Sequence, residues 1–200
     1  MPEAFYWGPF VGIDTVSDEV CNELLKRAYK VKETGENAAH HLAGHFKTEY
    51  YFTKDDKKYF IENTNHIWDN YIKRSKLHYS KDLCKNGLKL DSLWVNFMGP
   101  NDFNPIHTHN GHLSFVLYLD VPKELETENI NEKNNDVFGG PGCITFLWGD
   151  TGSTMAITQN TRLPKTKEMY IFPASTRHMV YPYKSNVTRI SMSGNLFFRD

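Results

Sequence analysis

The stretch that decides the fold is NPIHTHNGHLSFVLYL, residues 104–119. Apolar and polar side chains alternate along its second half, which is the period of a β-strand with one covered face. The dipeptide Asn-Gly at 110–111 stands between two such runs and predicts a two-residue hairpin turn. We therefore expect His109 to face His112 across the turn, with His107 on the same face of the hairpin.

The two faces of this predicted hairpin differ in chemistry. One face carries His107, His109, His112, Ser114, Val116 and Tyr118. The opposite face carries Leu113, Phe115, Leu117 and Leu119. A wholly apolar face must be covered, so we expect the leucine face to pack against helices or a second sheet. The histidine face is then the inner face, where chemistry takes place.

Further short runs with a period of two fill the second half of the chain. They are LDSLWVNFM (90–98), CITFLW (143–148), MAIT (155–158), MYIF (169–172) and RISMSGNLFF (189–198). Gly, Pro and Asn separate them. Six or more short strands with no helix between them indicate a sandwich or barrel, of which the jelly roll is one form. The charged stretch 123–140 interrupts them and is expected to be a mobile loop.

The first half of the chain has a helical period instead. Ser17 is expected to cap a helix over residues 18–30. The apolar face of this helix would carry Val20, Cys21, Leu24, Leu25 and Ala28. A second helix is expected from about Lys54 to Leu77, because apolar residues recur there every three or four positions. A short strand over Phe10–Ile13 precedes the first helix, and residues 40–52 are expected to form a loop that runs into a strand.

Helices followed by a row of strands indicate a mainly β, α+β arrangement. We expect residues 1–200 to form a single domain. In it, an N-terminal helical support region (1–87) would pack against a jelly-roll core (88–200). A chain of 200 residues is long enough for one well-packed core.

The composition argues against several kinds of partner. A net charge of −1 gives no electrostatic footprint for nucleic acid or an anionic membrane surface. No apolar run approaches the roughly 18 residues that cross a bilayer, and the first ten residues lack the pattern of a signal peptide. Three widely spaced cysteines (Cys21, Cys84 and Cys143) argue against a disulfide framework. We therefore expect a reduced, cytoplasmic protein, and the sequence leaves a homodimer open.

The histidines are the main candidates for chemistry. His107, His109 and His112 fall within six residues, and a distal histidine, His178, is followed eleven positions later by Arg189. Imidazole binds iron, zinc, copper and nickel, and two histidines with a carboxylate mark non-haem Fe(II) oxygenases. A histidine cluster, a distal histidine and an arginine together indicate an oxygen-activating iron site with an anionic cosubstrate.

The last strand supports the anionic partner. Arg189, Ser191, Ser193 and Asn195 share one face of it. Buried and unpaired, such polar groups would each cost about 1–3 kcal/mol. Either solvent or a bound carboxylate removes that cost. The planar fork of Arg189 suits a carboxylate, although a surface ion pair is the simpler interpretation.

A second histidine cluster, His40, His41 and His45, lies between the predicted helices. Gly44 argues against a stable helix there, and no accompanying carboxylate gives the usual zinc-protease pattern. We expect a loop, with closure of the active site as the alternative.

The stretch from about Leu93 to Phe198 resembles the catalytic core of Fe(II)/2-oxoglutarate-dependent dioxygenases, in the prolyl-hydroxylase-like branch. The segments that carry the resemblance are NPIHTH, LSFVLYLDVP, GGPGCITF, IFPASTRHMVYP and TRISMSGN, in that order. The N-terminal PFVGIDTVSDEVCNELL is also similar to the entry into such folds. The resemblance implies a double-stranded β-helix, which is a distorted, cupin-like jelly roll with helices packed outside.

The resemblance also implies roles for individual residues. His107 takes the place of the first Fe(II) ligand, and His178 takes that of the distal ligand. Arg189 takes the place of the residue that binds the distal carboxylate of the cosubstrate 2-oxoglutarate. Tyr118 and Ser191 lie on the inward faces and would complete the cosubstrate pocket.

The sequence departs from the family pattern at one position. The usual motif is His-x-Asp, and here the second position is His109. Either His109 is a third metal ligand, or no protein ligand fills that position. His112 competes with it in the predicted hairpin. We expect His109 to be the third ligand, because it occupies the motif position and shares the face of His107.

The reaction that the resemblance implies consumes O2 and 2-oxoglutarate, releases succinate and CO2, and hydroxylates a substrate that the sequence does not identify. A prolyl residue fits the branch, and other protein side chains and small molecules stay open. Two other classes compete with this interpretation. A cupin-like dioxygenase with three histidines would not use 2-oxoglutarate, and Arg189 would then hold a substrate carboxylate. A non-catalytic jelly-roll binding protein would need no metal.

Overall fold

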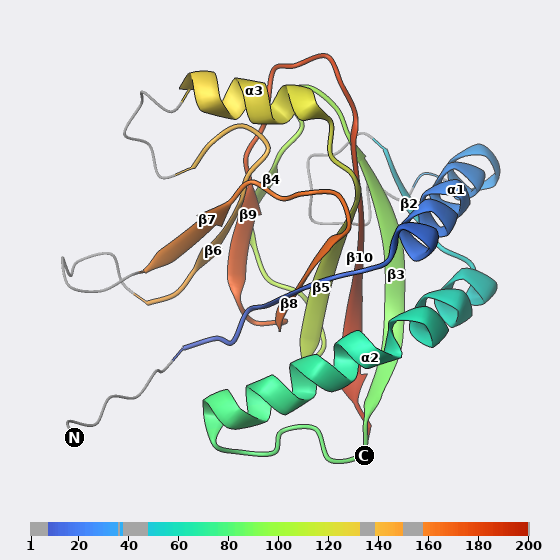
Figure 1. Cartoon of the computed structure of the whole chain (residues 1–200), viewed down its shortest axis with the longest axis vertical. Helices are drawn as coiled ribbons and strands as arrows, with labels where there is room; N and C mark the ends of the chain where they lie inside the picture. The colour runs from blue at the N-terminus through green and yellow to red at the C-terminus, as the bar shows by residue number, and fades with distance from the viewer. Residues whose placement is uncertain (1–7, 36, 38–47, 133–138, 150–157, 200) are drawn as a thin grey trace.

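Two antiparallel sheets face each other in the computed structural model, which describes residues 8–35, 37, 48–132, 139–149 and 158–199 (Figure 1). The larger sheet contains, in spatial order, β1 (Gly12–Thr15), β8 (Glu168–Pro173), β5 (Leu113–Asp120), β10 (Arg189–Phe198), β3 (Leu88–Met98) and β2 (Glu49–Tyr51). The smaller sheet contains β4 (Asn104–His107), β9 (Arg177–Val180), β6 (Ile144–Leu147) and β7 (Gln159–Arg162). This architecture is the predicted jelly roll.

Two helices cover the outer face of the larger sheet (Figure 1). α1 (Asp18–Thr34) begins after Ser17, whose hydroxyl accepts from the N–H of Val20 as predicted. α2 (Lys54–Tyr79) begins with a capping box, in which Thr53 and Asp56 satisfy each other's backbone N–H groups. Such caps supply partners for N–H groups that the first turn leaves unpaired, so they fix where both helices begin.

The alternation along β5 divides the core into two layers, as predicted. Phe115 points toward the helices and stacks on Phe60 of α2, with ring centroids 4.9 Å apart. Val116 and Tyr118 point the other way, into the space between the sheets. The inner face of β5 is therefore the face that reaches the candidate site.

The predicted hairpin at 110–111 is wrong. β4 pairs with β9, and β5 pairs with β8 and β10, so residues 108–112 cross from one sheet to the other. The turn residue still has its expected conformation, because Gly111 has φ +99° and a Cβ there would lie 2.8 Å from the carbonyl oxygen of Leu196. Long-range pairing of both flanking strands outweighs the local hairpin preference.

The predicted mobile loop at 123–140 is also wrong over its first part. Residues Lys123–Glu132 form helix α3, which lies at one end of the molecule (Figure 1). Leu125 and Asn129, one helical turn apart, are its buried positions. A single apolar residue with a buried amide is too weak a pattern to reveal the helix, although Lys, Glu and Leu favour one.

Smaller differences concern the ends of elements. β1 begins two residues later than the predicted strand at Phe10, and α2 ends two residues beyond Leu77. The predicted strand at 155–158 and the histidines at 40, 41 and 45 lie outside the described residues, apart from Thr158. The division into residues 1–87 and 88–200 of one domain remains a prediction. β1 and β2, from the first part, form the two edges of the larger sheet.

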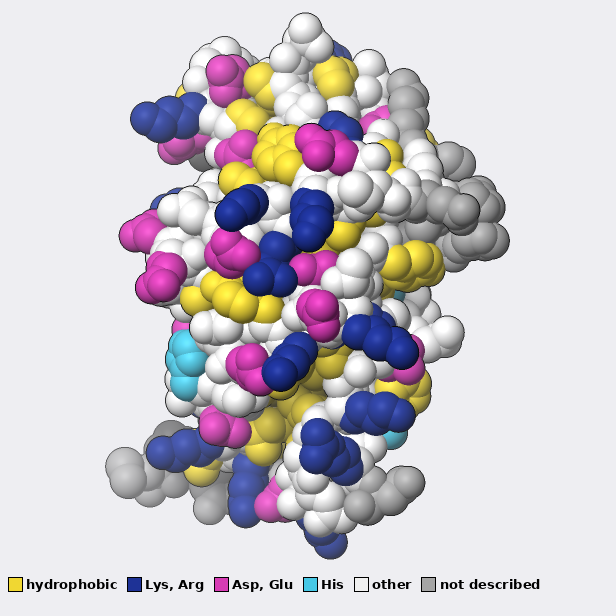
Figure 2. Space-filling model, turned by 90° about the vertical axis from the view of Figure 1, so that its right-hand side faces the viewer, with side chains coloured by type: hydrophobic (Ala, Val, Ile, Leu, Met, Phe, Trp, Pro, Cys, Tyr) yellow, Lys and Arg dark blue, Asp and Glu magenta, His cyan; other side chains and the backbone are white. Residues whose placement is uncertain are grey.

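The surface agrees with the near-neutral composition. On the side of the molecule that α1 covers, Lys and Arg alternate with Asp and Glu (Figure 2). No helix in the described part of the chain has the length and hydropathy needed to cross a membrane. All three cysteines are buried, and no disulfide joins them. A cytoplasmic location and a homodimer remain predictions.

Candidate metal centre

Two neighbouring strands of the smaller sheet bring the first two histidines together. His107 ends β4, and His178 lies directly opposite it in β9. Directly opposed residues on one face of a sheet have Cβ atoms about 5 Å apart. Here the two imidazole centroids are 4.2 Å apart. Pairing of β4 with β9 thus brings together two histidines that lie far apart in the sequence.

His109 joins this pair from the segment that crosses between the sheets. The backbone N–H of His109 donates to the carbonyl of Ala174, and this bond connects the segment to the turn before β9. Its Nε2 lies 3.2 Å from Nε2 of His178, and its ring lies 5.8 Å from the ring of Trp94. The ligand atoms of the three histidines all lie within 4.8 Å of one another.

Backbone carbonyls fix the rings of two of these histidines. Nδ1 of His107 donates to the carbonyl of Pro105 over 2.7 Å, and Nδ1 of His178 donates to the carbonyl of Thr176 over 3.0 Å. A carbonyl oxygen only accepts, so each Nδ1 carries the proton and each Nε2 keeps a free lone pair. Metal-bound histidines usually donate their second N–H in this way.

Burial keeps the three imidazoles uncharged. It lowers the pKa of His107. It lowers the pKa of His109 to about 3, and repulsion from the other two rings adds to the effect. Burial and repulsion from His107 lower the pKa of His178 to about 4, against the opposing effect of its hydrogen bond to Thr176. Neutral imidazole is the form that binds a metal ion.

These three nitrogens could hold one transition-metal ion. Two nitrogens bound to one metal at about 2.1 Å and at roughly right angles lie about 3 Å apart. That matches the separation of the Nε2 atoms of His109 and His178. Within the described part of the chain, no carboxylate joins the group. Imidazole donors of this kind suit iron.

The competing histidine, His112, lies elsewhere. Its exposed ring stacks on Phe198 with centroids 4.5 Å apart, and its Nδ1 accepts from the N–H of Phe198. The backbone N–H of His112 donates to the carbonyl of Leu196. The structure therefore groups His109, and not His112, with the other two histidines.

A buried arginine lines the same cavity. Arg189 is 1% exposed, and its Nη1 donates to the carbonyl of Gly142 over 2.6 Å. Its Nε has no partner among the described residues, and neither has the hydroxyl of Tyr118. The guanidinium carbon lies 5.3 Å from the centre of the Tyr118 ring. Ser191 lies opposite Tyr118 in the register of β5 and β10.

An anionic ligand would satisfy these groups. Unpaired buried polar groups cost about 1–3 kcal/mol each. Burial raises the pKa of Tyr118 to about 12, against an opposing effect of Arg189, so its hydroxyl remains a donor. A carboxylate between Arg189 and Tyr118 would accept from both. This donor set fits the distal carboxylate of 2-oxoglutarate.

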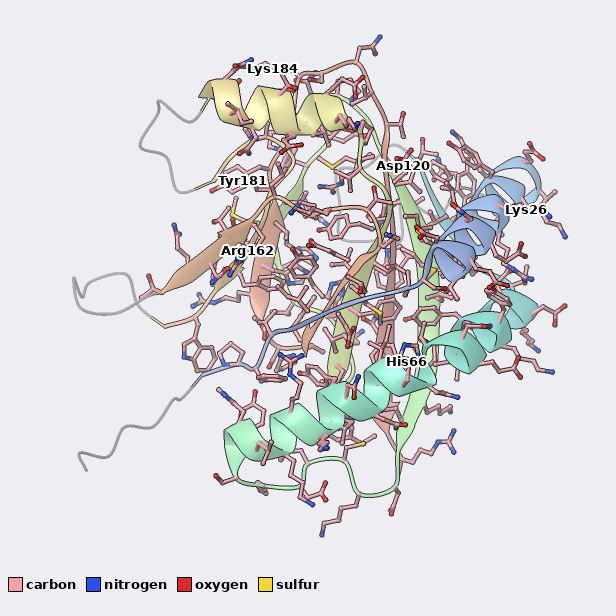
Figure 3. The ribbon with its side chains drawn as sticks, viewed as in Figure 1. Lys26, His66, Asp120, Arg162, Tyr181 and Lys184 are labelled. Carbon is pink, nitrogen blue, oxygen red and sulfur yellow. The ribbon has the colours of Figure 1, made fainter. Side chains whose placement is uncertain are left out.

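The cavity between the sheets also contains residues that the sequence did not single out. Its volume is about 40 Å³, and Trp94, Asn96 and Asn104 line it together with the predicted residues and Ser193. Residues 90–98 alternate in polarity, which places Trp94 and Asn96 on one face of their strand. This alternation was the sequence pattern that could have indicated both residues. A larger hollow of about 360 Å³ lies beside Trp148 and Arg162, and none of the three histidines lines it. Figure 3 labels Arg162.

The family model of the 2OG-Fe(II) oxygenases matches residues 92–195. The chain belongs to this family. It is therefore an oxygenase that uses Fe(II), O2 and 2-oxoglutarate, as the resemblance implied. Neither the cupin-like alternative nor the non-catalytic one has such support.

Solved structures with the same fold include several oxygenases of this family. A prolyl-4-hydroxylase from Pseudomonas putida is 12% identical with a TM-score of 0.64, over 95% of this chain and 93% of that one. A Trichoplax adhaerens prolyl hydroxylase, in complex with a peptide of hypoxia inducible factor, is 12% identical with a TM-score of 0.59, over 96% of this chain and 84% of that one. A collagen prolyl hydroxylase of Paramecium Bursaria Chlorella virus-1, in complex with 2-oxoglutarate, is 14% identical with a TM-score of 0.56, over 93% of this chain and 94% of that one. Among curated protein sequences none matches.

Proposed function

We propose that His107, His109 and His178 hold the catalytic Fe(II) of this oxygenase. The observation that carries the proposal is the convergence of three uncharged imidazoles within 4.8 Å of one another. The carbonyls of Pro105 and Thr176 orient two of the rings and fix their tautomers. His109 thereby stands where the family pattern has an aspartate.

Arg189, Tyr118 and Ser191 hold 2-oxoglutarate in this proposal. Gly142 fixes one end of the Arg189 guanidinium, which leaves Nε directed to the cosubstrate carboxylate. The hydroxyl of Tyr118 donates a second hydrogen bond to that carboxylate. Charge-assisted bonds of this kind are about twice as strong as neutral ones, so they fix which end of the cosubstrate faces the metal.

Fe(II) with 2-oxoglutarate supplies O2 activation, in which one oxygen atom enters succinate and the other hydroxylates a substrate C–H bond, with release of CO2. The chain's own residues position the reactants and exclude water. Phe172 and Phe146 flank His178, with ring centroids 4.8 and 6.0 Å away, and shield that side of the site. A third neutral histidine leaves the centre one positive unit more charged than a site with an aspartate, which changes the electrostatic environment of the metal.

The prime substrate is a peptide or a small molecule. A prolyl residue remains our prediction for it. The prolyl hydroxylases with the same fold motivate this choice, although identities of 12–14% carry the fold alone.

Release of succinate from 2-oxoglutarate, without any added substrate, tests the proposed site. We expect slow succinate formation with Fe(II), none after chelation, and recovery when Fe(II) is returned. His112→Ala, outside the cluster, should behave as wild type, whereas His107→Ala should lose the activity. An active His107→Ala variant would contradict the assignment.

A further inference from the structure

The edge strand β2 places a carboxyl group on the inner face of the larger sheet. Glu49 lies opposite Asn96 of β3. The next residue, Tyr50, packs against Phe97 on the outer, helix-covered face, with ring centroids 6.2 Å apart. Because side chains alternate along a strand, Glu49 and Asn96 share the inner face. Asn96 lines the cavity of the candidate metal centre.

Several oxygen atoms on this side of the cavity lack a hydrogen-bond donor. Glu49 is 1% exposed, and its Oε2 has no partner in the described part of the chain. The Oδ1 atoms of Asn96 and Asn104 are buried and equally without partners there. Asn104 lines the same cavity. Buried polar atoms are almost always satisfied, so three orphaned acceptors indicate a ligand that brings N–H donors.

The charge around Glu49 points to the kind of donor. Burial raises the pKa of its carboxyl to about 8, and repulsion from Asp102 adds to the effect. Asp102 is itself buried. The described residues thus supply Glu49 with a second acid and with no basic side chain within reach. Burial destabilises the ionised form of this carboxyl group, and a neighbouring cation that also makes hydrogen bonds would stabilise it.

We propose that Glu49, with Asn96 and Asn104, recognises an ammonium or guanidinium group of the prime substrate. The inference rests on the proposed function and narrows its substrate class to molecules that carry a cation, which in a prolyl peptide would belong to a residue near the proline. His109 leaves the metal centre without the family's anionic ligand, so a cationic substrate would meet one extra positive charge. Glu49, opposite the cavity residue Asn96, would lose its proton next to such a cation and supply a negative charge beside the cavity, which offsets that repulsion.

Four probes separate charge from shape. They are the Nα-acetyl methylamides of lysine, norleucine, arginine and citrulline, in which the first and third are cations and the others their near-isosteric neutral partners. Free lysine and an acetylated Gly-Gly-Lys-Gly-Gly amide distinguish a small molecule from a peptide as the source of the cation. Binding is measured by calorimetry in the presence of Fe(II) and 2-oxoglutarate under argon, and succinate release is measured in air.

We expect wild-type protein to bind each cation at least about tenfold more tightly than its neutral partner, which is the effect of one charge-assisted hydrogen bond. Glu49→Gln should reduce that preference to about twofold or less. Glu49→Asp should retain part of it. The matched control is Asp120→Asn. Asp120 also has a pKa raised by burial, but it lies at the end of β5 (Figure 3) opposite Ile190, which does not line the cavity.

Equal binding of both cationic probes and their neutral partners to wild-type protein would overturn the proposal, whether or not the variants fold. An undiminished cation preference in folded Glu49→Gln would overturn it too. Succinate release without a probe reports the proposed function separately. A protein that forms succinate but ignores charge would contradict only the role of Glu49, and one that prefers cations but forms no succinate would contradict only the proposed function.

Discussion

At the scale of single residues, one cavity contains three uncharged histidines and an arginine. This arginine has no acid partner in the described part of the chain. Burial keeps His107, His109 and His178 neutral. The same burial leaves Nε of Arg189 without a partner in the described residues. A metal ion with an anionic cosubstrate satisfies both sets of groups at once, which is why the two assignments support each other.

Removal of a histidine should remove the metal. We expect His107→Ala and His178→Ala each to lower the iron content of purified protein by at least about tenfold, since a lost direct ligand costs more than a lost supporting hydrogen bond. His112→Ala is the control, because its ring stacks on Phe198 away from the cluster. Elemental analysis measures the iron. Undiminished iron in both variants would refute the site.

The shape of the arginine side chain should matter as much as its charge. Arg189→Lys keeps the charge and loses the planar fork. We expect the apparent affinity for 2-oxoglutarate to fall by about ten- to a hundredfold. Titration of 2-oxoglutarate with succinate as the readout measures it. Arg177→Lys, at an exposed position of β9, should have no effect. Equal affinities in all three proteins would mean that Arg189 is not the cosubstrate residue.

Sequence patterns predicted His107, His178 and Arg189, because the family motifs carry them in a fixed order. They favoured His109 over His112 only by its motif position and its predicted face. That choice depends on how residues 108–112 cross between the sheets, and the crossing follows from pairing of β4 with β9 far along the chain. No sequence pattern indicated that Glu49 is buried, because its exposure depends on which edge of the sheet β2 joins.

At the scale of elements, α3 supports the arginine indirectly. Leu125 of α3 is fully buried and lies in the core between the sheets. A Cβ added to Gly142 would lie 3.3 Å from its side chain, so the two are in close contact. The carbonyl of Gly142 holds Nη1 of Arg189. The helix therefore positions the turn on which Arg189 rests.

Truncation of this contact should be costly. We expect Leu125→Ala to lower the free energy of unfolding by about 2–5 kcal/mol, the usual cost of a cavity in a packed core. Ile130→Ala, on the same helix but 57% exposed, should change it by less than about 1 kcal/mol. Urea unfolding of both variants measures the difference. Similar values for both would contradict the packing of α3.

At the scale of the whole molecule, the jelly roll follows from alternating patterns, and these were sufficient to predict five of its strands. The helix α3 was not predictable, because half of its residues are charged and only its contacts with the sheets cover Leu125. The buried carboxyl of Glu49 is likewise a property of the complete fold. It makes global stability depend on pH.

The direction of that dependence follows from the raised pKa of Glu49, about 8 against an ordinary value of 4.5. Between these values the folded protein holds a proton that the unfolded chain releases, so the free energy of unfolding falls as pH rises through this window and stays low above it. Glu49→Gln removes the effect. We expect metal-free Glu49→Gln to melt about 5–10 °C above wild type at pH 9 and near it at pH 5. Glu62→Gln, on the exposed side of α2, is the control. The same difference at both pH values would contradict a titrating Glu49.

The central claim is that one cavity holds the metal on three histidines and 2-oxoglutarate on Arg189. Anomalous diffraction at the iron edge, from crystals grown anaerobically with Fe(II) and 2-oxoglutarate, tests it most directly. The account predicts one iron peak within bonding distance of His107, His109 and His178, and a cosubstrate carboxylate paired with Arg189. A peak without His109, or a cosubstrate bound away from Arg189, would contradict it.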